Sequence, residues 1–199
     1  RHTRLLRVSG LGDVYKRQDE FQMRHRRNPI HHMQSRLKTI QSMLEKLKRK
    51  NYEVSINSAV KNLQDIAGIR VICSYVQDVY TIANLLVSQD DVHLVRMADY
   101  IREPKPNGYR SLHLIVEIPV FLSEGRILVP VEVQIRTIAM DFWASLEHSL
   151  RYKAQEYIPQ HISDELQRVA TDIASLDQRM QAIHDQVDEL SDARSDNAT

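Results

Sequence analysis

The ten residues PKPNGYRSLH, at positions 104–113, join a stiff basic loop to the start of a predicted strand. Pro104 and Pro106 each fix φ and remove a backbone donor, so they hold this loop extended. Gly108 permits a positive φ, or a close approach of another group to the backbone. A base ring could stack on Tyr109 while its basic neighbours, Lys105 and Arg110, meet the phosphates. An ordinary surface loop that leads into a hairpin has a similar composition.

The residues that follow this loop predict an antiparallel hairpin. Leu112 to Ile118 and Ile127 to Ile135 alternate as strands, and Ser123-Glu124-Gly125 reads as the turn between them. If the turn centres near Ser123-Glu124, paired residue numbers sum to about 247. Gln134 then lies opposite His113, with Glu132 one diagonal step away. Three polar groups would share one patch of sheet, although a face open to solvent shows the same alternation.

Upstream, the spacing of apolar residues between Met33 and Lys50 predicts an amphipathic helix. Three cations of this segment, Lys38, Lys46 and Arg49, fall on one stripe of that helix, with Arg36 near its start. A cationic stripe beside an apolar stripe suits phosphate binding. Many helices of soluble proteins have the same pattern without binding anything.

The next chemical signal surrounds a predicted strand over Ile69 to Val76. Arg70 falls inside the strand pattern, where an unpaired buried charge is costly. The strand is therefore expected at a sheet edge, or on a sheet face that carries a ligand. Asp65 precedes the strand, where its carboxylate can point into a cleft, although a turn or cap residue fits equally well. A helix capped by Asp78 and a strand from Val92 to Met97 follow.

The C-terminal part of the sequence predicts two helices. Thr137 to Lys153 is expected to turn Ile138, Phe142, Leu146 and Leu150 inward, with Trp143 beside them. Beyond Pro159, apolar residues continue in steps of four and three to Leu190, which is typical of a coiled coil. We expect a lead of disordered or non-native residues over 1–18, a domain over 19–158, a helix for packing or assembly over 159–192, and a disordered tail over 193–199.

Composition limits the class of protein. The 199 residues suffice for one domain with an appendage, and no apolar run approaches the ~20 residues of a membrane span. Cys73 is the only cysteine, so no internal disulfide can form and a reducing compartment, the cytoplasm, is expected. Residues 1–50 hold 14 Lys and Arg against 4 Asp and Glu, whereas the remainder holds 13 against 22. This asymmetry predicts a polyanionic ligand near the basic part.

Four segments together resemble the synthetase domain of the RelA/SpoT family, and within it the small alarmone synthetases of the RelQ type. They are DIAGIR at 65–70, KPNGYRSLH at 105–113, EVQIRT at 132–137 and FWASLEH at 142–148. The resemblance implies an α+β, nucleotidyltransferase-like fold, a mixed sheet flanked by helices with a long C-terminal amphipathic helix. It also implies transfer of pyrophosphate from ATP to the 3′-hydroxyl of GTP or GDP, which makes (p)ppGpp, with Mg²⁺ as cofactor.

The resemblance also implies a role for each matching residue. Asp65 and Glu132 would hold Mg²⁺, and Glu132 would also take the proton from the 3′-hydroxyl. The ATP site would consist of Arg36 and Arg70 on either side of adenine, with Lys38, Lys46 and Arg49 at the phosphates. Tyr109 would stack on guanine, with Lys105, His113 and Gln134 near the acceptor nucleotide.

Two departures from the family pattern concern regulation. HMQS at 32–35 stands where the RelQ type has residues resembling FVTG, and Asp141 stands where Asn is usual. In the RelQ type, the residues at the first of these positions help to form an allosteric (p)ppGpp pocket between subunits. The resemblance further implies a homotetramer and binding of single-stranded RNA. The alternatives are a toxin-like pyrophosphotransferase that acts on tRNA 3′ ends or adenine nucleotides, and a non-catalytic RNA-binding module.

Overall fold

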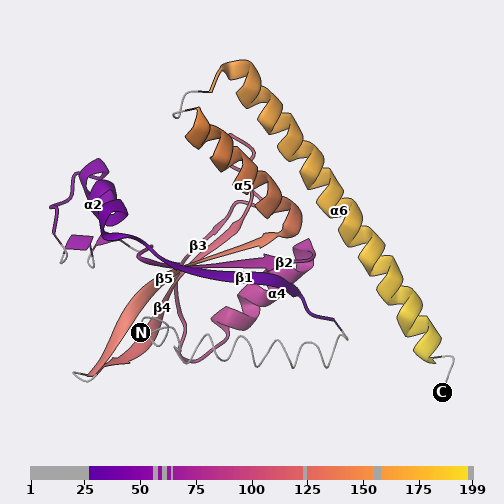
Figure 1. Ribbon diagram of the computed structural model, residues 1–199. Coiled ribbons are helices and arrows are strands. Elements are labelled where there is room, and N and C mark those ends of the chain that lie inside the picture. The colour runs from indigo at the N-terminus through magenta and orange to yellow at the C-terminus, as the bar shows by residue number, and fades with distance from the viewer. Residues whose placement is uncertain are drawn as a thin grey trace.

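A computed structural model of the chain describes residues 27–55, 58–59, 62–63, 65–122, 125–154 and 158–196, and shows a mixed sheet flanked by helices (Figure 1). The strand order is β1-β2-β5-β4-β3. β2 and β5 are parallel, and the other neighbours are antiparallel. The strands are β1 (Ile30–Leu37), β2 (Ala67–Cys73), β3 (His93–Asp99), β4 (Leu112–Leu122) and β5 (Gly125–Thr137). The expected α+β class is therefore confirmed.

Helices cover the two faces of the sheet differently. α4 (Val76–Val87) packs on one face, and α5 (Ile138–Lys153) rises from the end of β5 beside the long α6 (Gln160–Asp196) (Figure 1). The main hydrophobic core joins α4 to the inward residues of the central strands, including Val71, Leu114 and Val133. α2 (Ile40–Arg49) lies at one end of the sheet and packs Leu47 against Leu63. No helix of the described segments is long and apolar enough to cross a bilayer.

The predicted hairpin register is confirmed. Each β4–β5 pair sums to 247, and Gln134 pairs with His113. The predicted turn at 123–124 lies outside the described residues, and β5 begins at Gly125 with φ +125°. Because β2 lies between β1 and β5, Arg70 is on an interior strand, where it pairs with Gln34 and with Gln134. One row of side chains from four strands thus crosses the polar face, which supports the expectation of a ligand-bearing face.

The helix predicted from Met33 to Lys50 is wrong over its first part. Residues Ile30–Leu37 form β1, antiparallel to β2, and α2 begins only after Thr39. Met33 and Leu37 match a helical spacing, but the open edge of β2 offers hydrogen bonds that local spacing does not reveal. The strand gives way to helix at Thr39. Its hydroxyl accepts a hydrogen bond from Ser42 N at 3.2 Å and so caps the start of α2.

The inward face predicted for α5 is wrong for four residues and confirmed only for Trp143. Ile138, Phe142, Leu146 and Leu150 are all exposed, whereas Met140, Trp143, Ala144 and Glu147 are buried. The four predicted residues share one face, but the sheet and α6 contact the opposite face. Trp143 is buried because its indole packs on Ala170 of α6 and its Nε1 donates to the Leu166 carbonyl at 3.0 Å.

The last helix is confirmed, but it is longer than expected. It runs to Asp196, whereas we expected the helix to end at residue 192 and a disordered tail to follow over 193–199. Extending an existing helix needs no new nucleus, so polar residues after Ser191 can continue it. The apolar series predicted to pack is largely exposed, as the following residues show: Ile162, Val169, Leu176, Met180, Ile183, Val187 and Leu190.

Candidate active site

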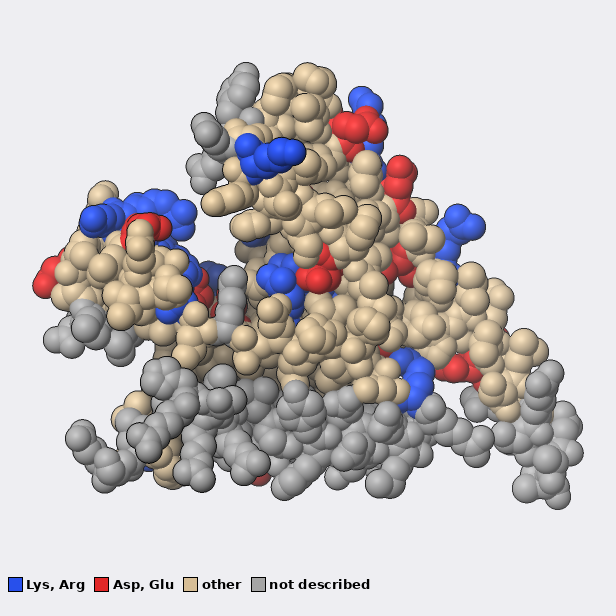
Figure 2. Space-filling model, viewed as in Figure 1, with Lys and Arg blue, Asp and Glu red and all other residues tan. Residues whose placement is uncertain are grey.

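A cleft of about 560 Å³ lies over the polar face of the sheet, where that face meets α5. Figure 2 shows a hollow between the α2 end of the molecule and α5, with Lys and Arg side chains at its margin. Four residues that line the cleft were predicted as site residues: Arg70, Tyr109, Glu132 and Gln134. Residues from all four sequence motifs, the fourth of which lies in α5, therefore line one cleft.

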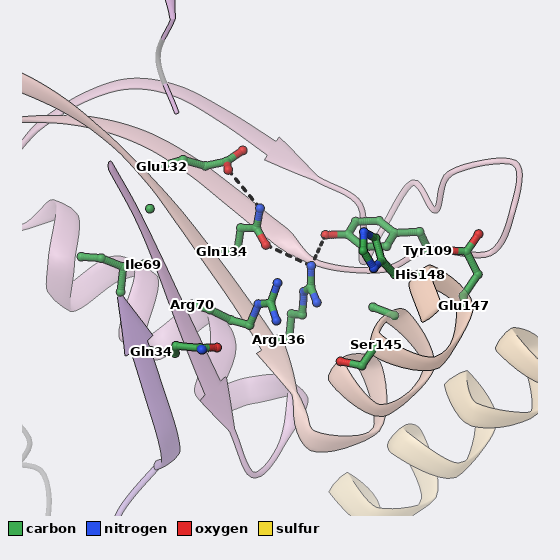
Figure 3. Close-up of a pocket in the computed structure, with 12 residues that line it drawn as sticks. Gln34, Ile69, Arg70, Tyr109, Glu132, Gln134, Arg136, Ser145, Glu147 and His148 are labelled. Atoms are coloured by element: carbon green, nitrogen blue, oxygen red, sulfur yellow. Dashed lines mark hydrogen bonds between the residues drawn. The ribbon is translucent and has the colours of Figure 1, made fainter. Parts of the chain in front are cut away.

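A chain of hydrogen bonds crosses the cleft from Glu132 to Tyr109 (Figure 3). Gln134 Nε2 donates to Glu132 Oε2 at 3.0 Å, and Arg136 Nη2 donates to Gln134 Oε1 at 3.0 Å. The same Arg136 nitrogen donates to the Tyr109 hydroxyl at 2.5 Å. Neighbouring side chains of one strand face thus hold the carboxylate and the aromatic ring in a fixed relation.

Glu132 is an ionised carboxylate in this environment. His113 Nδ1 lies 3.5 Å from Oε1, and hydrogen bonding and charge from His113 lower the pKa of Glu132 below its ordinary value. Burial and the negative charge of Asp65 act in the other direction, and the hydrogen bond from Gln134 helps His113 to overcome them. An ionised carboxylate in a cleft can accept a proton or bind a cation.

Asp65 lies in a second cluster beside the cleft. Lys38 Nζ and Lys46 Nζ each lie 2.5 Å from Asp65 Oδ2. Burial alone would raise the pKa of Asp65, but the two lysines outweigh it and hold the pKa below its ordinary value. The other oxygen, Oδ1, is buried and has no hydrogen-bond partner among the described residues. Asp65 is not among the residues that line the cleft, but its negative charge acts on Glu132 and raises the pKa of that carboxyl slightly against the other influences.

Asp65 and Glu132 are the carboxylates predicted to bind Mg²⁺. Among the described residues, no group of three or more His, Cys, Asp or Glu side chains could hold a metal ion. Mg²⁺ in phosphoryl-transfer sites is commonly bound by one or two carboxylates together with substrate phosphates. The unpartnered Asp65 Oδ1 and the ionised Glu132 fit that pattern. Two protein ligands are therefore enough, provided that a nucleotide supplies the others.

Aromatic residues and a lysine form the third group. Lys105 Nζ lies 4.6 Å from the ring centre of Tyr100 and 4.8 Å from that of Tyr109. The Tyr109 hydroxyl also lies 2.9 Å from His113 Nε2. Tyr109 therefore contacts both Lys105 and His113, the two other residues of this group predicted for the acceptor nucleotide.

Some predicted residues contribute differently from expectation. Arg49 ends α2 and is exposed, away from the contacts that Lys38 and Lys46 make with Asp65. The side chain of Arg36 lies outside what the structure describes. The backbone of Arg36 belongs to β1, where it pairs with Gly68 of β2, and does not start a helix. Neither Lys105 nor Arg110 is among the residues that line the cleft, and the guanidinium of Arg110 pairs with Asp177 of α6 at 3.6 Å.

Sequence reasoning missed Arg136, Tyr100 and Asp141 as parts of the site. Arg136 shares the strand face of Glu132 and Gln134, so the alternation alone could have identified it. Tyr100 contacts His113 edge to face at 5.2 Å, which depends on the pairing of β3 with β4. Asp141 lies 3.1 Å from Arg136 Nη1 and 3.6 Å from Arg70 Nη1, so this carboxylate joins two cations of the cleft.

Comparison with known proteins agrees with this geometry. The model of the region found in RelA and SpoT proteins matches residues 35–157. The chain belongs to the RelA/SpoT family. The match runs from the end of β1 through α5, so it includes every residue that lines the cleft except Gln34.

Members of the family with solved structures or curated names are close in sequence. The chain is 46% identical to the GTP pyrophosphokinase YwaC of Bacillus subtilis, over 85% of this chain and 80% of that protein. Small alarmone synthetase 1 of B. subtilis bound to its product pppGpp superposes with a TM-score of 0.81 at 36% identity, over 90% of this chain and 92% of the other. The same enzyme bound to AMPCPP gives 0.71 at 33% identity, over 92% of each chain.

Proposed function

We propose that this RelA/SpoT family member transfers the β,γ-pyrophosphate of ATP to the 3′-hydroxyl of GTP or GDP and so makes (p)ppGpp. The observation that carries the proposal is the ionised Glu132 in a cleft that also holds Arg70 and Tyr109. Structures of one relative, small alarmone synthetase 1 of B. subtilis, bound to pppGpp and to AMPCPP support a site for each of the two nucleotides. The family's named relatives are GTP pyrophosphokinases, so the alternatives, a tRNA-modifying toxin and an RNA-binding module, are not favoured.

The donor nucleotide would lie on the β1–β2 and α2 side. Arg70 shares the cleft with Gln34, and we assign it to one face of adenine, with Arg36 on the other. Lys38 and Lys46 already meet at Asp65, and phosphate oxygens would give both ammonium groups additional negative partners. Arg49 at the exposed end of α2 is assigned to the outer phosphates.

The acceptor nucleotide would lie on the β4–β5 side. We assign guanine to the ring of Tyr109, whose hydroxyl is held by Arg136 and His113. Lys105 lies against the same ring, and its ammonium would move to the phosphates of the acceptor when guanine occupies the ring face. Gln134 and His113 flank Glu132, so the ribose hydroxyl would lie beside the ionised carboxylate.

The reaction then needs one proton transfer and one displacement. Glu132 removes the proton from the 3′-hydroxyl as its oxygen attacks the β-phosphorus of ATP, and the bond from that phosphorus to the α-phosphate oxygen breaks, releasing AMP. Lys38 and Lys46 stabilise negative charge on the transferred group. Asp65 and Glu132 would hold Mg²⁺, which supplies charge neutralisation of the phosphates.

The direct test is a product assay. Purified protein is incubated with Mg²⁺, ATP labelled in its β- or γ-phosphate, and GDP, GTP, GMP or tRNA, and the products are separated. Label should transfer to GDP or GTP with release of AMP. Absence of any guanine product from protein whose folding is confirmed by circular dichroism would falsify the proposal, and label on tRNA would favour the toxin-like activity.

The assignment of Tyr109 has its own test. Tyr109→Ala removes the stacking surface and should raise the KM for GDP by about tenfold, with the KM for ATP little changed. Tyr109→Phe keeps the ring and serves as the matched control, with a smaller effect. Equal weakening of both substrates by the alanine variant would contradict the assignment of guanine to this ring.

The proposal extends to partners. We propose a homo-oligomer, a tetramer by the family resemblance, because α5 and α6 both expose stripes of large apolar residues. We also propose that the protein acts in the cytoplasm, where its nucleotide substrates are made. Regulation by (p)ppGpp and binding of single-stranded RNA stay predictions from the resemblance.

A further inference from the structure

The face that α6 turns toward the rest of the chain is small and polar. Its buried residues are Ala170, Asp177 and His184, which recur at intervals of seven. Leu166 and Ile173 are half-buried against Trp143 and Ala170, whereas most other large apolar residues of the helix are exposed. A buried carboxylate is costly unless it is paired. Asp177 is 6% exposed, so its surroundings must explain why it occurs on this face.

Asp177 connects α6 to two parts of the active site. Its Oδ2 accepts a hydrogen bond from Thr137 Oγ1 at 2.8 Å and lies 3.6 Å from Arg110 Nη1. Thr137 ends β5 and caps α5, since the same Oγ1 accepts from Met140 N at 3.1 Å. Arg110 directly follows Tyr109 in the chain. One carboxylate of α6 thus restrains both the start of α5 and the residue beside the acceptor tyrosine.

Gly108 provides an independent contact between the same loop and α6. Its φ is +86°, and a Cβ at this position would lie 2.4 Å from the Ala170 Cβ. The loop backbone is therefore pressed against the helix, with the Trp143 ring 3.8 Å from the same point. The indole is fixed to α6 in turn, because its Nε1 donates to the Leu166 carbonyl.

The other end of the loop is fixed to α5. Asn107 Nδ2 donates to Glu147 Oε1 at 3.1 Å, and Asn107 Oδ1 accepts from Tyr109 N at 3.3 Å. Tyr109 thus lies between Asn107, which α5 holds, and Arg110, which α6 holds. Any shift of α6 relative to α5 would be transmitted to the tyrosine ring through these neighbours.

We propose that α6 forms part of the acceptor side of the active site, with Asp177 as a positioning residue that holds Arg110 and thereby the ring of Tyr109. The proposal rests on the assignment of the acceptor nucleotide to Tyr109 made above. It gives α6 a role in the affinity for the guanine nucleotide that is separate from any role in assembly.

The first test is Asp177→Asn in the full-length protein. The amide can still accept from Thr137, but Arg110 loses its counter-charge, so the loop loses its restraint. We expect the KM for GDP to rise about tenfold while the KM for ATP changes less than about twofold. Asp172→Asn removes the same charge from an exposed position of the same helix and should leave both constants unchanged.

Fluorescence of Trp143, the only tryptophan, separates positioning from loss of structure. Because its indole lies between α5 and α6, an unchanged emission maximum in Asp177→Asn means that α6 is still docked. A raised KM for GDP with unchanged emission supports the proposal. An unchanged KM, or a red-shifted emission with both KM values raised together, overturns it. If Tyr109→Ala also leaves the KM for GDP unchanged, the fault lies in the proposed function instead.

A second pair of variants tests the Gly108 contact without touching Asp177. Gly108→Ala should raise the KM for GDP because the new methyl group collides with Ala170. Adding Ala170→Gly removes the nearest atom and should recover part of that loss, although the positive φ still disfavours alanine. If the double variant is no better than Gly108→Ala alone, contact with α6 does not position the loop.

Discussion

At the scale of single residues, the chemistry assigned to the cleft depends on the charge of Glu132. Glu132→Gln keeps the size of the side chain but cannot accept the proton, so kcat should fall by about 10²–10⁴-fold. Binding of ATP should persist, because Arg70, Lys38 and Lys46 are unchanged. Steady-state assays and equilibrium dialysis measure the two effects, with the exposed Glu165→Gln as control. A kcat near that of the wild type would remove Glu132 as the base.

The ion pairs of Asp65 predict a pH dependence of stability. Its pKa is lowered in the folded state, so its contribution is fully present above the unfolded value of 3.8 and is lost as the pH falls through the folded value. The difference in unfolding free energy between wild type and Asp65→Asn should be largest above about pH 5 and shrink below 3.8. Urea titrations across this range measure it.

Asp172→Asn is the matched control for that experiment, since Asp172 is exposed and should give a small difference at every pH. A difference for Asp65→Asn that grows as the pH falls would have the opposite sign and would contradict the pairing with Lys38 and Lys46.

The candidate site was predictable from the sequence where local alternation determines it. Glu132, Gln134 and His113 follow from strand period and turn position alone, since side chains two residues apart share a face. Tyr100 and Asp141 could not be found this way, because their roles depend on the pairing of β3 and on where α5 packs. Arg110 was assigned to phosphate because nothing local reveals a buried aspartate 67 positions later.

At the scale of elements, α2 depends on its first residue for a defined start. Thr39→Ala removes the acceptor for Ser42 N and should lower the free energy of unfolding by about 1 kcal/mol. The KM for ATP should rise with it, because α2 carries Lys46 to Asp65. Thr39→Ser keeps the hydroxyl and should behave as wild type. Urea unfolding and steady-state kinetics measure the two effects. If the alanine variant is destabilised but its KM for ATP is normal, α2 does not contribute to binding of ATP.

The segment before α2 was predicted as helix but forms β1, for a reason that local sequence does not show. Two apolar residues four apart satisfy a helix, but a strand that completes a sheet gains backbone hydrogen bonds from a partner distant in sequence. Residues 30–37 pair with residues 67–73. In contrast, the β4–β5 hairpin pairs residues adjacent in the chain, so its register could be derived from the turn alone.

At the scale of the whole molecule, the distribution of apolar surface is unusual for a monomer. The four-three series of α6 was identified correctly, but only part of it packs within the chain. Leu166 and Ile173 pack against Trp143 and Ala144 of α5, whereas most of the other members are exposed. Gln181 and His184, which contact Gln77 and Tyr75 respectively, belong to the packed face. Periodicity identifies an apolar stripe but does not tell whether its partner lies in the same chain.

This surface leads to a prediction about assembly. The exposed stripe from Val169 to Leu190 extends about 32 Å along α6, enough for a second copy to pack against it. Light scattering should give a mass that is a multiple of 23.2 kDa, and Ile183→Glu with Val187→Glu should reduce it. Gln178→Glu, exposed on the same helix, controls for the added charge. A wild-type mass of 23.2 kDa at micromolar concentration would refute self-association through α6.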